Sequence, residues 1–140
     1  MNKLIILLIT ILLNLSPGYA AKWYKVTDKY YVDLNSVQRY NDYPFLYNST
    51  AYTFWNKVLN NKNAEFNKIE RLYDKKVWYK LERTIIDCAS STYAVKSSIY
   101  YDLQNHAIYN LENNKYTLTL NSIPPDTLIY WHYRWICSTR

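Results

Sequence analysis

The chain has 140 residues, including 17 tyrosines, five tryptophans and a single glycine, and its formal charge at pH 7 is +6. This length suits one domain with one hydrophobic core. The basic residues are dispersed along the sequence, which indicates a solvated basic surface and argues against a basic nucleic-acid-binding tail. Attraction to an anionic envelope or an acidic polymer is the alternative.

The N-terminal segment has the pattern of a signal peptide. An apolar block, Leu4–Leu15, follows a short basic start, and Gly18 and Ala20 occupy the −3 and −1 positions of a cleavage site. An uncleaved membrane anchor is the alternative, but the block is short for a span of about 20 residues. We therefore expect removal of residues 1–20 and export of residues 21–140, as one domain, to the periplasm or the cell surface. No lipid-carrying cysteine follows the block, and we expect no membrane span after cleavage.

The first half of the exported domain is expected to be mostly strands. Two short strands are predicted at residues 22–26 and 29–33, because aromatic and β-branched residues flank a turn between them. A helical turn is predicted at residues 34–39, and a long strand from Tyr43 to Leu59. Because glycine is nearly absent, we expect asparagine and aspartate to form the turns.

The second half is expected to be a strand meander. The polar, asparagine-rich residues 60–74 predict a long connection with a helical turn at Ala64–Leu72. Four further strands are predicted at residues 75–88, 92–101, 106–111 and 116–120. Short connections between strands predict antiparallel pairing. Strict alternation cannot place both Ile85 and Ile86 on one side, so we expect a β-bulge there or a sheet that is apolar on both faces.

The segment Ser122–Cys137 is predicted to be the C-terminal helix. Ser122 suits an N-cap, and the two prolines that follow fit the start of a helix, which can spare their missing N–H groups. Asp126 in the first turn suits the positive end of the helix dipole. The sequence from Thr127 onward contains no helix breaker.

The predicted helix is apolar on nearly all sides. At 100° per residue, Ile129, Tyr133 and Ile136 share one face, which we expect to pack on the sheet. The sheet residues expected to lie near this face are Trp23, Val32, Tyr52, Phe54, Leu81, Ile85 and Ile86. The opposite side of the helix carries Leu128, Trp131 and Trp135. These three residues are the candidate interface, for a dimer or another partner, unless the N-terminal strands or residues 41–59 fold over them.

The two cysteines are expected to form a disulfide. Cys137 has one possible partner in the chain, Cys88, which ends the predicted strand 75–88. Export favours their oxidation. A bond between them would hold the terminal helix on the sheet, which gives an α+β fold: an antiparallel sheet of about six strands with a C-terminal helix packed on one face.

Several motifs of the domain recur in a known family. They are Trp23, Tyr31–Ser36 with its Val-Asp-x-x-Ser pattern, Trp55, the Asp-Cys pair in Ile85–Cys88, and the proline-initiated helix closed by Cys137. On these residues the exported domain resembles the bacterial surface-adhesin protein E family. The resemblance implies a sheet of about six antiparallel strands with a disulfide-tethered C-terminal helix. It also implies adhesion to host matrix and serum proteins such as laminin, vitronectin and plasminogen, and a homodimer as in the best-known relative.

Signatures of catalysis are missing from the sequence. His106 and His132 have no partner pattern for a zinc site or a catalytic base, and we expect no metal and no cofactor. His132 lies between Trp131 and Tyr133 and is expected to pack, and His106 is expected to be exposed. Asp33 and Asp87 each end a predicted strand, where turn and capping roles are usual.

We therefore predict a non-enzymatic binding protein of the bacterial envelope with protein partners, host matrix proteins among them, and no nucleic acid. The alternative is a periplasmic structural or assembly protein that associates with itself.

Overall fold

The structure, a computed structural model, describes residues 20–45 and 50–139. The predicted signal peptide lies outside these residues, apart from Ala20. The elements in chain order are β1 (Trp23–Lys25), β2 (Tyr30–Arg39), β3 (Ala51–Leu59), α2 (Ala64–Tyr73), β4 (Val77–Asp87), β5 (Thr92–Asp102), β6 (Ala107–Glu112), β7 (Asn121–Ser122) and α3 (Leu128–Thr139).

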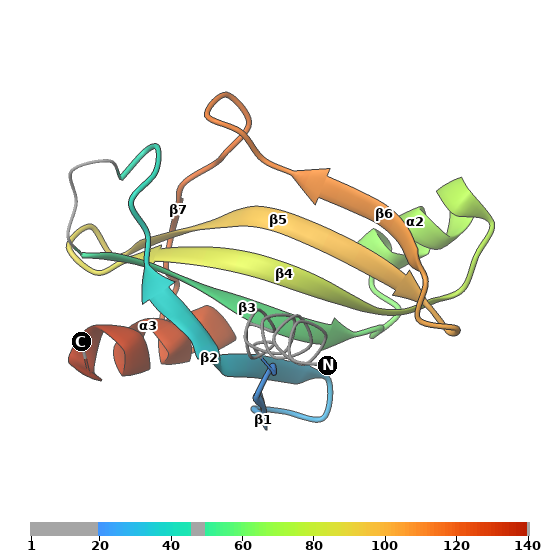
Figure 1. The fold of residues 1–140 in the computed structure, drawn as a ribbon, viewed down its shortest axis with the longest axis horizontal. Coiled ribbons are helices and arrows are strands. Elements are labelled where there is room, and N and C mark those ends of the chain that lie inside the picture. The colour runs from blue at the N-terminus through green and yellow to red at the C-terminus, as the bar shows by residue number, and fades with distance from the viewer. Residues whose placement is uncertain (1–19, 46–49, 140) are drawn as a thin grey trace, which may run out of the picture.

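The strands form one antiparallel sheet in the order β1-β2-β3-β4-β5-β6, and the short β7 pairs with β5 beyond the end of β6. Figure 1 shows α3 at one end of this sheet and α2 at the other. The predicted fold class, an antiparallel sheet with a C-terminal helix tethered by a disulfide, is confirmed. Each strand from β1 to β6 pairs with its neighbour in sequence, which is the antiparallel meander that the sequence predicted.

The α3 end of the sheet contains the first hydrophobic cluster. Ile136 of α3 has no exposed surface. It packs with sheet residues that project toward the helix: Val32, Val37, Tyr52, Phe54 and Ile86. Ile129 and Tyr133 are half-buried at the margin of the same cluster. The predicted orientation of the helix is therefore confirmed.

The α2 end has a second cluster on the same face of the sheet. Phe66 and Ile69 of α2 are buried there against Val77 and Tyr100. The side chain of Asn63 caps the helix by accepting a hydrogen bond from the Phe66 N–H at 3.0 Å. The helical turn predicted at Ala64–Leu72 is thus confirmed as a ten-residue helix.

The opposite face of the sheet carries a third cluster. Ile85 packs there with Tyr40, Phe45 and Ala51, beneath Leu118, whereas its neighbour Ile86 faces α3. The sheet is therefore apolar on both faces at this point. Ile85 and Ile86 pair in regular register with Ala94 and Tyr93, and the nearest register shift lies between Arg83 and Thr84, so the alternative of a sheet apolar on both faces is the one that occurs. Among the residues expected near α3, Ile85 was placed on the wrong face, and Trp23 and Leu81 do not join the cluster.

Residues 34–39 do not form the predicted helical turn. They continue β2 through an irregularity, where the β2–β3 register shifts between Asp33 and Gln38. The Ser36 hydroxyl donates to the Asp33 carbonyl at 2.7 Å and accepts from the Trp55 N–H at 2.8 Å. The tertiary hydrogen bond with Trp55 keeps the segment in the sheet.

Two predicted strands are wrong in extent or place. The long strand begins at Ala51, because residues 40–45 form a loop with a cis peptide bond between Tyr43 and Pro44. Residues 46–49 of that prediction lie outside the described residues. Residues 116–120 form a turn and loop, since Asn114 accepts hydrogen bonds from the N–H groups of Tyr116 and Leu118.

The C-terminal helix begins at Leu128, so its cap is Thr127, five residues later than the predicted cap Ser122. Ser122 belongs to β7 and pairs with Thr92. Asp126 adopts left-handed backbone, with φ of 59°, so it cannot lie in the first turn. Thr127 supplies the cap instead, and its hydroxyl accepts a hydrogen bond from the Tyr130 N–H at 3.3 Å.

Residues with positive φ angles show which residue types form the turns, where asparagine and aspartate were expected. Among the described residues, asparagine and aspartate occupy three of the five such positions, namely Asp74, Asn105 and Asp126. Lys62 and Ser91 occupy the other two. The expectation was therefore correct in part.

Candidate functional site

The predicted disulfide is present. Cys88 follows β4 directly, Cys137 lies in the last turns of α3, and their Cα atoms are 5.6 Å apart. The bond joins residues 49 positions apart in sequence and attaches the helix to the end of the central strand. It therefore fixes the position of α3 relative to the sheet.

Asp87 organises the turn that carries Cys88. Its carboxylate accepts hydrogen bonds from the Ser90 N–H at 3.1 Å and from the Thr50 hydroxyl at 2.6 Å. Burial opposes ionisation of this carboxyl, but the bonds from Ser90 and Thr50 outweigh it and lower the pKa of Asp87. The Cys88 N–H donates to the Thr50 carbonyl at 3.0 Å. The expected turn role of Asp87 is thus confirmed.

The Val-Asp-x-x-Ser pattern also has a structural role. The Asp33 carboxylate accepts from the backbone N–H groups of Lys22, at 3.0 Å, and Asn35, at 3.1 Å. Together with the Ser36 hydroxyl, it joins β1, the irregular part of β2, and β3. The sequence predicted Asp33 at the end of a strand, but Asp33 lies inside β2.

An apolar groove runs between α3 and the β1–β2 hairpin. Its volume is about 420 Å³, and its lining residues are Tyr24, Val26, Val32, Leu34, Trp131, His132 and Trp135. Trp131 is 63% exposed and Trp135 is 39% exposed. Leu128, the third residue of the candidate interface, is exposed at the start of the helix. The N-terminal strands thus form the opposite wall of the groove but do not cover the tryptophans.

His132 lies on the inner side of this groove. Its ring is buried, stacks on Phe54 with centroids 5.3 Å apart, and approaches the Tyr30 ring at 5.4 Å. Burial lowers the pKa of His132, although a 2.7 Å contact from its Nδ1 to the Leu128 carbonyl acts in the opposite direction. The predicted packing role is confirmed, and His106 is exposed as predicted.

A partly buried charge network joins α2 to the sheet. The Lys80 Nζ contacts Glu65 Oε1 at 2.9 Å and Glu82 Oε2 at 2.7 Å, and the Tyr100 hydroxyl donates to Glu65. Burial opposes the charge on Lys80, but Glu82 and Glu65 outweigh it and raise the Lys80 pKa. Burial likewise opposes the charge on Glu65, and Tyr100 and Lys80 outweigh it, so the Glu65 pKa is lowered. Every member pairs with another, which makes this cluster a structural connection between elements.

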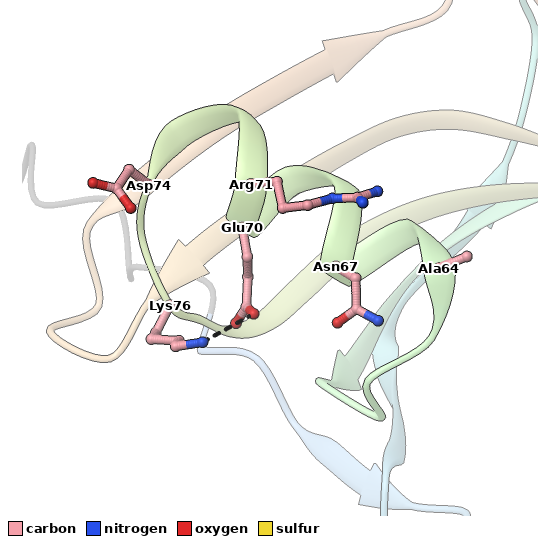
Figure 2. A pocket seen from close by; sticks show the side chains of 6 residues that line it. All are labelled: Ala64, Asn67, Glu70, Arg71, Asp74 and Lys76. Atoms are coloured by element: carbon pink, nitrogen blue, oxygen red, sulfur yellow. Dashed lines mark ion pairs between the residues drawn. The ribbon is translucent and has the colours of Figure 1, made fainter.

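A more open polar depression of about 620 Å³ lies on α2, lined by Ala64, Asn67, Glu70, Arg71, Asp74 and Lys76. Figure 2 shows Glu70 and Lys76 pointing toward each other while Asp74 points away. The Lys76 Nζ and the Glu70 Oε2 form an ion pair at 3.5 Å. The Glu70 carboxylate also accepts from the Val77 N–H at 2.9 Å and from the Asn60 side chain at 3.2 Å. Glu70 therefore serves the connection from α2 to β4, and the other side chains do not converge on a ligand.

Residues 20–45 and 50–139, the part of the chain that the structure describes, contain neither a cluster of potential metal ligands nor a membrane-spanning helix. No group of three potential metal ligands occurs there. No helix in this part of the chain has the length and apolar character that a membrane crossing requires.

The sequence located one wall of the groove but missed the other. Trp131 and Trp135 stood out because an amphipathic helix could not bury them together with Ile136. Tyr24 and Leu34 gave no comparable signal, since alternating aromatic and aliphatic residues occur throughout the strands. Only the β1–β2 register, which pairs Tyr24 with Val32, places them opposite α3.

Comparison with known proteins identifies the fold. No protein-family profile matches the sequence, and no curated protein matches it. Solved structures of Haemophilus influenzae protein E do match. A selenomethionine form is 19% identical, with a TM-score of 0.56 over 89% of this chain and 94% of that one. A second crystal form is 17% identical, with a TM-score of 0.54 and the same coverage.

A third structure, of protein E from a non-typeable Haemophilus influenzae, is 19% identical, with a TM-score of 0.55 over 89% of this chain and 82% of that one. Each of these similarities covers 89% of the chain. At this level of identity the likeness concerns the fold, and it confirms the resemblance that the sequence motifs indicated. The chain has the protein E fold.

Proposed function

We propose that this protein is an exported, non-enzymatic binding protein of the bacterial envelope that recognises a macromolecular partner through the groove between α3 and the β1–β2 hairpin. The observation that carries the proposal is the exposure of Trp131 and Trp135 in an otherwise apolar groove. Exposed aromatic patches of this kind usually mark an interaction site, and tryptophan is enriched among the residues that contribute most to binding.

The charged clusters support a binding role rather than catalysis. Lys80, Glu65 and Glu82 satisfy one another, and Asp87 is held by turn hydrogen bonds. A catalytic group needs access to a substrate and a pKa suited to proton transfer near the working pH. The ion pairs of Lys80 and Glu65 instead favour the charged forms of both groups, as a structural role requires.

Export and cell-surface location belong to the same proposal. The N-terminal pattern and the disulfide both favour an oxidising compartment. The resemblance to surface adhesins makes a host matrix protein one class of partner to test. Cell fractionation with protease added outside the cells tests location: cleavage in intact cells supports surface display, whereas a protected periplasmic protein contradicts a direct adhesin role.

The binding proposal is tested by capture of matrix and envelope proteins on the protein purified after export. Trp131→Ser and Trp135→Ser should each weaken capture while leaving the melting temperature nearly unchanged, because both side chains are exposed. Trp78→Ser is the matched control, since Trp78 is similarly exposed but does not line the groove. Equal capture by all three variants would contradict the assignment of the groove.

Self-association is the second candidate function, and the same exposed tryptophans favour it. A dimer that buries Trp131 and Trp135 would fill the groove with a second copy of the chain. Light scattering on the unmutated protein at tens of micromolar, which corresponds to roughly −6 kcal/mol of binding free energy, tests this. A monomer at that concentration rejects the dimer, and a dimer that both serine variants preserve would place the contact elsewhere, such as a free strand edge.

A further inference from the structure

Within residues 20–45 and 50–139, no strand pairs with the outer edge of β1, which lies beside the groove. β1 is the first strand of the sheet, and among the described residues its strand partner is β2. The Leu34 N–H donates to the Lys22 carbonyl at 3.3 Å, and the Val26 N–H donates to the Tyr30 carbonyl at 2.9 Å. Antiparallel ladders bond at every second residue, so Tyr24 bonds to Val32 across the same ladder. The N–H and C=O groups of Trp23 and Lys25 therefore point away from β2.

The side chains of β1 connect this open edge to the groove. Tyr24 lies opposite Val32, and both line the groove. Tyr24 is 59% exposed. Because strand side chains alternate between faces, a strand added beside β1 would place every second side chain next to Tyr24, on the face that Trp131 and Trp135 overhang.

Charged residues around the groove favour an acidic occupant. The hairpin exposes Lys22, Lys25 and Lys29, and α3 exposes Arg134. Asp28 is the exposed carboxylate of the hairpin, and it pairs with Lys25 at 2.7 Å. Among the described residues, the other three cations form no ion pair, so a carboxylate-bearing partner would find complementary charge.

The open edge also distinguishes a peptide from a lipid surface. Exposed tryptophans with nearby lysines can lie in a membrane interface. However, unpaired backbone N–H and C=O groups are costly in hydrocarbon, whereas a paired strand satisfies them. A hollow between a helix and a hairpin also fits inserted side chains better than a flat lipid surface.

We propose that the groove binds an extended segment of a protein partner with alternating apolar and acidic residues, which adds a strand to the free edge of β1. Its backbone would pair with Trp23 and Lys25, its apolar side chains would contact Tyr24, Trp131 and Trp135, and its carboxylates would face the lysines. This inference rests on the proposed function and specifies the chemical class of its partner.

The test is selection of a displayed library of random twelve-residue peptides on the protein purified after export. We expect enrichment of peptides in which apolar residues alternate with aspartate or glutamate. A synthetic copy of the enriched peptide is then measured by fluorescence anisotropy. Methylation of the backbone nitrogens that face β1 should weaken its binding by about tenfold or more, because at least one net backbone hydrogen bond is lost.

Protein variants supply an independent readout. Lys25→Pro removes an outward-pointing N–H and leaves the bonds between Tyr24 and Val32 in place, since proline is tolerated on an edge strand at such a position. Lys25→Ala is the control, because it removes the same charge but keeps the N–H. We expect Lys25→Pro to bind at least about tenfold more weakly than Lys25→Ala. The methylated peptide keeps the test valid if the proline variant fails to fold.

The outcomes separate this inference from the proposed function. Binding that Trp135→Ser abolishes, but that peptide methylation and Lys25→Pro leave unchanged, would overturn strand addition and retain the groove as a binding site. Enrichment of no peptide, together with tryptophan-dependent binding to phosphatidylglycerol vesicles, would overturn the peptide in favour of a lipid surface. Peptide binding that neither tryptophan variant affects would overturn the proposed function as well.

Discussion

The two helices lie on the same face of the sheet but are held there differently. α2 is capped by Asn63, buries Phe66 and Ile69, and is joined to the sheet by the Lys80 charge network. α3 buries Ile136 and His132, and a disulfide attaches its C-terminal end to β4. Each helix therefore buries two side chains, and the α2 end adds a charge network where the α3 end adds a covalent bond.

The two helices also differ in the surface that they present to solvent. The buried side of α2 faces its own cluster, and the depression on its outer side is polar. α3 leaves two tryptophans in contact with water beside an apolar groove. A helix that the disulfide holds in place can retain apolar surface for a partner, because its docking does not require all of that surface to be buried.

The largest effect should follow loss of the tether. Cys137→Ser should lower the free energy of unfolding by about 4 kcal/mol, the chain-entropy value for a loop of this length. Hydrogen exchange should then increase across α3 and remain slow in α2. Equal acceleration in both helices would show that the two ends of the sheet are not independent.

Truncation of the buried isoleucines should have the next largest effect. Ile136→Ala and Ile69→Ala should each cost about 3 kcal/mol, because both side chains are buried, one under each helix. Ile129→Ala should cost less, because Ile129 is only half-buried. Urea denaturation measures all three, and a cost for Ile129 equal to that for Ile136 would contradict the orientation of α3.

The N-caps should contribute less. Asn63→Ala removes the bond to the Phe66 N–H, and Thr127→Ala removes the bond to the Tyr130 N–H. Each should cost about 1 kcal/mol. We expect the loss at Asn63 to fray α2 and the loss at Thr127 to affect only the start of α3, because the disulfide holds the other end. Residue-specific amide exchange distinguishes these outcomes.

Acidification should lower the free energy of unfolding first through His132, which is buried at the α3 end of the sheet. The pKa of His132 is below its ordinary value of 6.5 because the ring is buried, so the unfolded chain takes up this proton before the folded one does. The free energy of unfolding should therefore fall as pH drops from about 6.5 toward the folded pKa. The Glu65 pKa is lowered from 4.5, so its contribution is lost only in more acidic solution.

His132→Gln is the matched variant for this pH dependence. It keeps a polar side chain at the position but removes the titration, and it should flatten the stability curve between neutral pH and the onset of carboxylate protonation. Thermal denaturation at a series of pH values measures both proteins. A slope that His132→Gln leaves intact would assign the effect to another group.

Much of the fold was accessible from sequence because its local patterns agree with its tertiary contacts. The strand meander, α2 and the cysteine pair were predicted correctly. Two of the errors, at residues 34–39 and at Ser122, fall where long-range bonds override local preference. Ser36 pairs with Trp55 and keeps residues 34–39 in the sheet, and Ser122 pairs with Thr92 and delays the helix. Neither partner can be identified from the local sequence.

The sequence predicted the α3 wall of the groove but not the wall that the β1–β2 hairpin forms. The helical repeat separates Trp131 and Trp135 from Ile136, so the exposed side of α3 followed from periodicity. The opposite wall depends on the β1–β2 register, which strand alternation does not determine until the pairing is known. The open edge of β1 depends on the order of all strands in the sheet.

The most direct test of the account uses the tryptophans as reporters. The protein has five, and their indole N–H groups give separate nuclear magnetic resonance signals that single substitutions assign. The titrant is the enriched peptide or a captured partner. We predict that the signals of Trp131 and Trp135 shift on binding, while those of Trp55 and Trp78 remain in place. Shifts of Trp55 and Trp78 with Trp131 and Trp135 unchanged would contradict the assignment of the groove as the binding surface.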